Sequence, residues 1–253
     1  MRKIKLGNKE YSKIICGTNA FYGHSHFSSA RDDEYKTRFS NDYITQTIKY
    51  CVDNGINAIE TCANERIQEI INLIRQECDI NLIGNTRIDE TSEMKSHQLK
   101  LKYLLENASD ICIIHSQYVD RPNSGGEIKG LQSMIDIIHR AGLLAGISTH
   151  KNSTIELCEK KYNLDVYLYP MNKLGFVYPG YEGNETVQER IELIKNTNKQ
   201  FIIMKTLAAG RISPMDGLRF ALDNIKEYDI ITLGLGSIDE AKESIEIINK
   251  HIE

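Results

Sequence analysis

The sequence lacks tryptophan, has only four prolines, and shows no CxxC pair among its six cysteines. The cysteines stand far apart, at positions 16, 51, 62, 78, 112 and 158. This spacing argues against a structural zinc site and against the dense disulfide framework of a small secreted domain. We therefore expect reduced thiols that behave mostly as small apolar residues of the core.

The sequence also lacks an excess of charge of one sign, and it lacks any long apolar run. The 31 basic and 35 acidic residues give a formal net charge of −4, which leaves no basic surface for nucleic acid or anionic lipid. No apolar run approaches the roughly 18 residues that span a bilayer, and residues 1–7 lack the apolar core of a signal peptide. We expect a cytoplasmic protein that binds a small-molecule substrate and neither nucleic acid nor a membrane. The sequence leaves the oligomeric state open.

What the sequence has instead is a repeated unit, a short apolar run followed by a polar turn and an amphipathic segment. Eight such runs span residues 13–19, 57–62, 80–86, 110–115, 143–149, 165–170, 200–206 and 229–235. One amphipathic segment carries isoleucines at helical spacing, Ile67, Ile70, Ile71 and Ile74. Continuous apolar runs are typical of parallel strands that are covered on both faces. We predict a single α/β domain over residues 1–253, folded as a closed (β/α)8 barrel of the TIM type.

Reactive side chains recur at one place in this unit, the end of a predicted strand or the turn just after it. They are His26, Glu60, His115, His150 and Lys205. The strand C-termini of a parallel barrel open on one face, and that face carries the active site of essentially all characterised barrel enzymes. We predict that the five side chains meet in one cavity. Cys62 closely follows Glu60, but no base in the sequence supports a nucleophilic role for its thiol.

Long connections follow three of the predicted strands, over residues 20–40, 116–127 and 171–183. Loops of this length at the functional face serve as lids and substrate walls, or are simply mobile surface loops. Aromatic faces and amide groups suit hydroxyl-rich ligands, so we expect a polyol or sugar-like substrate. The residues that we expect to contact it are Asn19, His26, Arg87, His150, Tyr169 and Asn172.

Five segments carry a resemblance to a known family. Residues 55–65 read GINAIETCANE, and the other four segments are 110–115, 141–148, 206–212 and 234–240. In this order they resemble the Asp-Thr-Ala signature and the fourth-, fifth-, seventh- and eighth-strand regions of the aldo-keto reductase superfamily. The resemblance implies a (β/α)8 barrel with oxidoreductase activity and NAD(P)H as cofactor. It also implies cofactor contacts from Ser148, Arg211, Gly236 and Ser237.

A closer resemblance rests on residues 17–26, 114–116, 148–150 and 204–211. These segments are similar to those of uncharacterised barrel proteins that are grouped beside the aldo-keto reductases. The resemblance to that group indicates which positions form the site but does not indicate which reaction takes place there.

The catalytic tetrad of the aldo-keto reductases, Asp, Tyr, Lys and His, is only partly matched. Glu60 occupies the position of the family's Asp, and His115 occupies the position of its His. Arg87 occupies the position of its Lys. The segment 62–65 is too short to hold the Tyr that donates a proton to the carbonyl, and an arginine does not give up its proton. We therefore expect His115 and Lys205 to carry the acid–base chemistry on a small carbonyl or hydroxylated substrate.

In this hypothesis His115 is the central acid or base, and Glu60 and Lys205 set its charge state. Arg87 and Arg211 hold an anionic or polar group of the ligand. Two interpretations of Lys205 stay open. Desolvation lowers its pKa and makes it a base or a Schiff-base nucleophile, or else it forms a salt bridge with Glu60 or another carboxylate.

The motif at residues 24–26 is similar to the HxH of metal-dependent barrel hydrolases. His26, His115 and His150, joined by Glu60, would give a ligand set suited to zinc or a similar divalent metal. A metal-dependent or cofactor-independent lyase, isomerase or hydrolase is therefore the alternative function. A barrel that lost catalysis and serves as a binding protein is the third. Solvated or capping roles are expected for the histidines in predicted helices, His97, His139 and His251.

Overall fold

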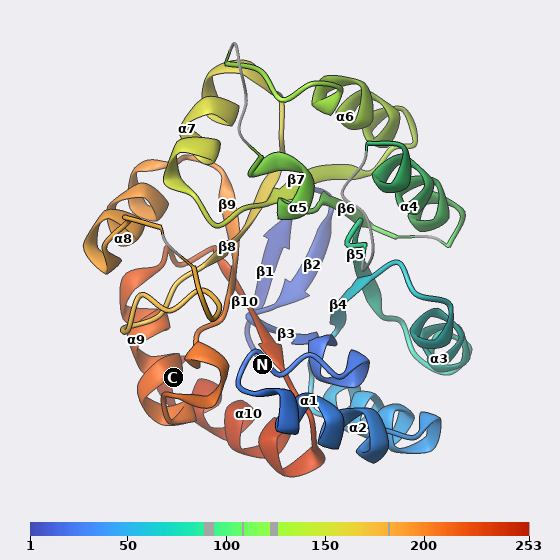
Figure 1. Ribbon diagram of the computed structural model, residues 1–253. Coiled ribbons are helices and arrows are strands. Elements are labelled where there is room, and N and C mark those ends of the chain that lie inside the picture. Colours follow the sequence, from blue (N-terminus) through green and yellow to red (C-terminus); the bar gives the residue numbers. More distant parts are fainter. Residues whose placement is uncertain (89–93, 108, 122–125, 182, 253) are drawn as a thin grey trace.

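Eight parallel strands close into a barrel whose strand order follows the chain (Figure 1). They are β3 (Ile14–Gly17), β4 (Ala58–Cys62), β5 (Asn81–Asn85), β6 (Ile111–Ile114), β7 (Leu144–Ser148), β8 (Val166–Pro170), β9 (Gln200–Met204) and β10 (Ile230–Gly234). Each strand lies within one of the eight predicted runs, and β10 pairs with β3 to close the barrel. The computed structural model describes residues 1–88, 94–107, 109–121, 126–181 and 183–252. The predicted (β/α)8 barrel is confirmed.

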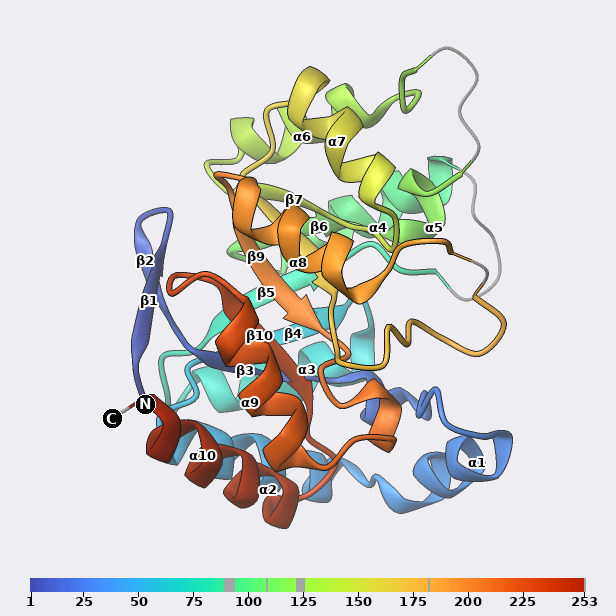
Figure 2. The same ribbon diagram turned by 90° about the vertical axis from the view of Figure 1, so that its left-hand side faces the viewer.

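Helices cover the outside of the barrel between consecutive strands (Figures 1 and 2). The longer ones are α2 (Asn41–Asp53), α3 (Glu65–Arg75), α4 (Met94–Glu106), α6 (Leu131–Arg140), α7 (Asn152–Lys161), α8 (Val187–Asn196), α9 (Pro214–Asn224) and α10 (Ile238–Ile252). The predicted isoleucine stripe of α3 is buried in the core. Each such side chain contributes about 1.5–3 kcal/mol by its burial. Within the described ranges, no helix combines the length and the apolar character that crossing a membrane requires.

Other helices lie in the connections at the functional face. The loop after β3 contains η1 (Asn19–Tyr22) and α1 (Ser29–Arg38), α5 (Ser116–Val119) follows β6, and η2 (Ala208–Gly210) follows β9. The hydroxyl of Ser28 caps α1 by accepting the Arg31 N–H. The predicted loop 20–40 is therefore partly helical. Residues 122–125 of the predicted loop 116–127, and residue 182 of the loop 171–183, lie outside the described residues.

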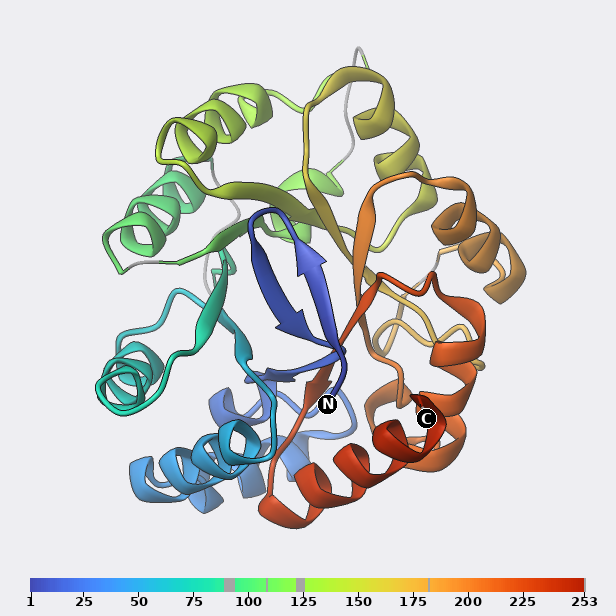
Figure 3. The same cartoon turned by 180° about the vertical axis from the view of Figure 1, so that it is seen from behind.

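An antiparallel hairpin, β1 (Lys3–Leu6) and β2 (Lys9–Ser12), precedes the barrel and was not predicted from the sequence. Figure 3 shows it lying across the end of the barrel that faces away from the strand C-termini. Its side chains Ile4, Leu6 and Tyr11 are buried among residues of the barrel interior. The hairpin therefore covers this end of the barrel. Each strand has four residues whose charged members are exposed, so neither forms a continuous apolar run.

The barrel is tightly packed where β3 meets β10. Gly17 pairs with Gly234, and a Cβ at Gly17 would lie 2.9 Å from Thr232 Oγ1 and 3.1 Å from the Leu233 carbonyl oxygen. A Cβ at Gly234 would meet nothing within 4 Å. Packing therefore requires a glycine at position 17 but leaves room for a side chain at position 234.

Candidate active site

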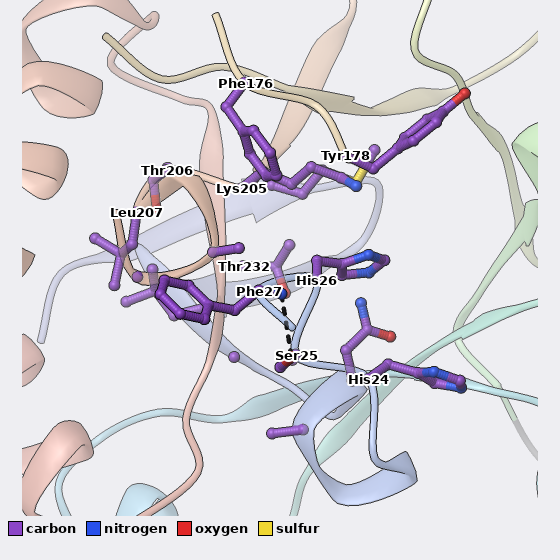
Figure 4. Close-up of a pocket in the computed structure, with 18 of the residues that line it drawn as sticks. His24, Ser25, His26, Phe27, Phe176, Tyr178, Lys205, Thr206, Leu207 and Thr232 are labelled. Carbon is purple, nitrogen blue, oxygen red and sulfur yellow. Dashed lines mark hydrogen bonds between the residues drawn. The ribbon is translucent and has the colours of Figure 1, made fainter. Parts of the chain in front are cut away.

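A cavity of about 580 Å³ lies at the C-terminal ends of the strands. Its walls include all five of the strand-end residues singled out in the sequence, His26, Glu60, His115, His150 and Lys205. Among the other predicted site residues, it is lined by Asn19, Arg87, Ser148 and Arg211. Figure 4 shows part of the cavity, with side chains from three separate loops, those of His26, Tyr178 and Lys205, around one space.

Glu60 is a buried carboxyl in β4, with 7 % of its surface exposed. Its Oε1 accepts a hydrogen bond from Asn85 Nδ2 on the neighbouring strand β5. Burial raises the pKa of Glu60 to about 7, although the Asn85 hydrogen bond and the charge of Arg87 oppose this shift. Both protonation states are therefore populated near neutral pH. Asn85 was missed in the sequence, although its place at the end of a predicted strand is the signal that marked the other site residues.

His115 follows β6 and caps the N-terminus of α5. Its Nδ1 accepts the Gln117 N–H at 3.3 Å, which leaves Nε2 to carry the proton of the neutral ring. Burial, followed by the positive charge of Arg87, lowers the pKa of His115 well below its usual value. The imidazole is thus a neutral hydrogen-bond donor at physiological pH. Burial and Arg87 set its charge state, whereas Glu60 and Lys205 were predicted to do so.

A buried chain of hydrogen bonds lies behind His115. The His115 N–H donates to Thr86 Oγ1 at 3.1 Å, and Thr86 Oγ1 lies 3.0 Å from His97 Nδ1. His97 is fully buried, and its ring centroid lies 5.2 Å from that of Tyr118. The expected solvated or capping role was therefore wrong for this histidine, because the helix α4 turns it toward the barrel.

His150 follows β7 and is held by an aspartate that the sequence gave no reason to single out. The His150 N–H donates to Asp120 Oδ2 at 2.8 Å, and its ring Nδ1 lies 3.5 Å from the same oxygen. The Thr154 hydroxyl donates to Asp120 Oδ1 at 3.0 Å. On the other side, Arg190 and Tyr181 donate to the His150 carbonyl at 2.9 and 2.8 Å. Burial lowers the pKa of His150, and the hydrogen bond with Asp120 opposes this shift.

Lys205 directly follows β9 in a left-handed backbone conformation with φ of 62°. The Asn172 side chain donates to the Lys205 carbonyl at 3.0 Å and so holds this turn. Burial, and next the charge of Arg87, lowers the pKa of Lys205 to about 8. No carboxylate of the described chain pairs with its Nζ, so the salt bridge with Glu60 that was one interpretation of this lysine does not form.

His26 lies on the loop before α1 (Figure 4), and hydrogen bonds fix that loop to the helix. The Ser25 N–H donates to Asp32 Oδ1 of that helix at 2.7 Å. His26 itself has φ of 54°, and its carbonyl accepts a hydrogen bond from Arg211 at 3.3 Å. Burial, and next the charge of Lys205, lowers the pKa of His26 to about 3, so this ring is also neutral.

The three histidines do not form a metal site in this fold. Among the residues that the structure describes, no group of three or more His, Cys, Asp or Glu side chains is arranged to hold a metal ion. His115 Nδ1 is used by Gln117, and His150 Nδ1 faces Asp120. The alternative ligand set of His26, His115 and His150 is therefore not assembled.

Arg211 connects three loops at the edge of the cavity. Its guanidinium carbon lies 5.0 Å from the ring centroid of Phe27 and 4.2 Å from that of Phe176. The turn before it contains Ala208 and Ala209 with φ of 48° and 57°. Left-handed backbone in residues with a Cβ costs on the order of 1–3 kcal/mol and clusters at functional sites. The β9–α9 turn is therefore a strained segment, held in place by this stack.

Two predicted substrate contacts do not reach the cavity. Tyr169 is fully buried, and its hydroxyl donates to Asn152 Oδ1. Asn172 is 2 % exposed. Its Oδ1 accepts backbone N–H groups of the following loop, while its Nδ2 donates to the carbonyl of Lys205. Tyr169 is bonded to another side chain and Asn172 holds backbone in place, and neither lines the cavity.

Three of the four residues expected to hold a nicotinamide dinucleotide, Arg211, Gly236 and Ser237, do not fit that group in this arrangement. The Gly236 N–H donates to Glu240 Oε2 at 2.7 Å, and Ser237 Oγ accepts the Glu240 N–H at 3.1 Å. The N-terminus of α10, where a phosphate would bind, is thus already occupied by a carboxylate. Glu240 also lines the cavity, where it would repel the phosphates of a dinucleotide. Arg211 already donates to two backbone carbonyls.

Comparison with known proteins gives matches at the level of structure. No family model and no curated protein matches the sequence. A protein from Pseudomonas aeruginosa assigned to the aldo-keto reductases matches 99 % of this chain and 95 % of its own, with a TM-score of 0.71 and 15 % identity. An aldo-keto reductase from Bacillus halodurans in its holo form matches 98 % of this chain and 91 % of its own, with a TM-score of 0.69 and 14 % identity.

A glycerol dehydrogenase from Gluconobacter oxydans gives a similar result. It matches 99 % of this chain and 96 % of its own, with a TM-score of 0.64 and 14 % identity. At such identities the likeness concerns the fold. The chain has the (β/α)8 fold of the aldo-keto reductases, as its sequence motifs implied.

Proposed function

We propose that this protein is an enzyme that transfers protons on a small hydroxy aldehyde or hydroxy ketone, as an isomerase or lyase does. One observation carries the proposal. Glu60 and Lys205 line the same cavity, and their pKa values move toward neutrality from opposite sides, to about 7 and about 8. Buried groups with such shifts gather at sites of acid–base catalysis.

Glu60 is the proton-transferring group in this proposal. A hydrogen on a carbon next to a carbonyl is removed by a base whose own pKa lies near the working pH. With a pKa of about 7, the Glu60 carboxyl accepts that proton in its ionised form and returns one in its neutral form. The hydrogen bond from Asn85 fixes its orientation during both steps.

The negative charge that develops on the carbonyl oxygen requires donors and cations. Neutral His115 offers its Nε2–H, and Arg87 supplies a permanent positive charge. Arg87 lies close enough to influence the ionisation of Glu60, His115 and Lys205 alike. The positive charge of Arg87 therefore acts on all three groups. It also stabilises an enolate relative to the neutral substrate.

The cavity suits a small polar substrate. Its volume of about 580 Å³ lies in the range of small-molecule sites. The walls combine apolar side chains, Leu168, Phe176 and Met204, with the polar Asn19 and Ser148. Apolar walls exclude water from the reacting carbon, and the polar groups offer hydrogen bonds to substrate hydroxyls.

Solvent exchange tests this function. The protein is incubated in D₂O with glyceraldehyde, dihydroxyacetone or erythrulose, and loss of the signal of the hydrogen next to the carbonyl is followed by proton NMR. We expect exchange above the rate without protein for at least one of them. Glu60→Gln should lower that rate by about 10²–10⁴-fold, the usual loss of general acid–base help.

The matched control is Glu69→Gln, which alters an exposed glutamate on α3. It should exchange at the wild-type rate, and circular dichroism should show that both variants are folded. If exchange is absent with all three compounds, or is unchanged in a folded Glu60→Gln protein, the proposed function is wrong.

Carbonyl reduction is the second candidate function. The observation that favours it is the fold shared with aldo-keto reductases and with a glycerol dehydrogenase. It requires a dinucleotide to bind despite the carboxylate of Glu240. Because the chain has no tryptophan, titration of the protein into NADH or NADPH can be followed by the fluorescence of the nucleotide. Saturable binding of either would make reduction the better candidate.

A further inference from the structure

Lys205 is a primary amine inside the cavity, and no carboxylate among the residues that the structure describes is paired with it. It lines the cavity, and its Nζ lies 5.6 Å from the ring centroid of Tyr178 (Figure 4). The titratable groups that face it are the charged Arg87 from the segment after β5 and the neutral rings of His26 and His150 from the loops after β3 and β7. A second permanent cation next to Arg87 would be repelled, so the site favours an uncharged amine.

The backbone fixes where this amine lies. Lys205 has φ of 62°, and its carbonyl accepts both the Asn172 amide at 3.0 Å and the Ala208 N–H at 2.9 Å. A left-handed residue that carries a Cβ persists only where its surroundings hold it. Three separate features therefore indicate a reactive amine at this position. They are its placement in the cavity, the absence of a counter-ion in the described chain, and the fixed backbone.

We propose that Lys205 captures the carbonyl group of an aldehyde or ketone as a covalent imine. This inference rests on the proposed function for its substrate class and adds a covalent intermediate to it. An iminium ion withdraws electrons from the neighbouring carbon more strongly than a carbonyl does. It therefore makes the hydrogen on that carbon easier for Glu60 to remove.

The step balances without an oxidant or a reductant. The Nζ lone pair attacks the carbonyl carbon and forms a C–N bond, while the C=O π pair moves to oxygen. Transfer of one proton from nitrogen to oxygen gives the neutral carbinolamine. The protonated carboxyl of Glu60 then gives a proton to the hydroxyl, which leaves as water, and the iminium C=N bond forms. Hydrolysis by the reverse sequence releases the product and the free amine.

Reductive trapping tests the imine directly. The protein is incubated with glyceraldehyde or dihydroxyacetone and sodium cyanoborohydride, and the adduct is located by peptide mass mapping. At pH 7, Lys205 should be labelled on the order of a hundredfold faster than Lys49, a partly exposed lysine paired with Glu77, because a much larger fraction of Lys205 is the free amine. Its labelling rate should level off above about pH 8, the pKa of Lys205, while that of Lys49 keeps rising.

Two variants show whether rapid labelling requires the amine nucleophile of Lys205 or only its positive charge. Lys205→Arg keeps a cation and removes the nucleophile, so rapid labelling should disappear, whereas Lys49→Arg should label like the wild type. If Lys205→Arg does not fold, the pH profile of the wild-type protein alone still decides. Labelling of Lys205 no faster than of Lys49 would overturn the imine.

Failure of the imine proposal can be distinguished from failure of the proposed proton-transfer function. Glu60-dependent exchange of the substrate hydrogen without preferential labelling of Lys205 would keep the proton-transfer function and remove the imine. Rapid labelling of Lys205 without any exchange would support the imine and remove the proton-transfer function.

Discussion

Asp120 holds His150 through one carboxylate oxygen, which accepts the backbone N–H at 2.8 Å and lies 3.5 Å from the ring Nδ1. The two residues come from consecutive βα units, since Asp120 follows α5 and His150 follows β7. The aspartate therefore sets both the position of the loop and the orientation of the ring. The other nitrogen of the ring is left available to the cavity that His150 lines.

Asp120→Asn should lower the pKa of His150 further, because the carboxylate is the group that opposes the effect of burial. Titration of the His150 ring by NMR measures this. Asp165→Asn changes a comparable pair, in which His139 Nε2 lies 2.9 Å from Asp165 Oδ2, and should leave the His150 titration unchanged. An unaltered titration in folded Asp120→Asn would mean that Asp120 does not act on the ring.

Glu60 should make stability depend on pH. Its pKa is about 7 in the folded protein and near the ordinary 4.5 in the unfolded chain. Between these values the unfolded chain loses the proton while the folded protein keeps it, so the free energy of unfolding falls as pH rises. The loss by pH 7 should be on the order of 3 kcal/mol. Below pH 4.5 and above pH 7 this group should contribute no further change.

Urea unfolding of wild type and Glu60→Gln at pH 5 and pH 7.5 checks this. The glutamine stays neutral, so the variant should lack this part of the pH dependence, while Glu69→Gln should retain it. Equal pH dependence in wild type and Glu60→Gln would show that the carboxyl ionises normally.

Gly17→Ala should destabilise the protein by about 1–3 kcal/mol, the usual cost of forcing an atom into a packed site. The new Cβ would lie 2.9 Å from Thr232 Oγ1 and 3.1 Å from the Leu233 carbonyl oxygen. Gly234→Ala, on the strand paired with it, should have little effect, because nothing lies within 4 Å of its Cβ position. Thermal unfolding compares the two variants. A Gly234→Ala loss as large as that of Gly17→Ala would contradict the packing argument.

Asn172→Ala should free the backbone of Lys205. The amide makes hydrogen bonds to the Lys205 carbonyl and to its own loop, and losing buried bonds of this kind costs about 1–3 kcal/mol. We also expect the preferential labelling of Lys205 to decrease. Asn224→Ala removes a more exposed amide that bonds only within its own helix, and should change neither quantity. Normal labelling of Lys205 in folded Asn172→Ala would show that the amide does not position the amine.

The strands and their ends were predictable because their signals are local. Each barrel strand lies within a short, mostly apolar run, and in a parallel barrel every run ends on the same face. The five strand-end residues could therefore be assigned to one cavity before any contact was known. The hairpin β1–β2 escaped prediction because each of its strands has only four residues and includes exposed charged side chains, so neither forms a continuous apolar run.

Partners and orientations could not be predicted in the same way. Asp120 meets His150, and Asn85 meets Glu60, across neighbouring units of the barrel. Tyr169 and Asn172 stand near a strand end as the site residues do, yet both are buried away from the cavity. Spacing along the chain does not say which side of the backbone a side chain takes at a strand end, because the regular alternation stops there.

Apolar periodicity and parallel topology were sufficient to predict a (β/α)8 barrel and the face on which its reactive side chains gather. The ionisation of those side chains follows from their surroundings in the folded protein. Burial around Glu60, Lys205 and His115, together with the charge of Arg87, shifts their pKa values. Among the residues that the structure describes, the three histidines of the cavity are not arranged to hold one metal ion. Such effects depend on distance and desolvation in three dimensions, which no pattern in one dimension specifies.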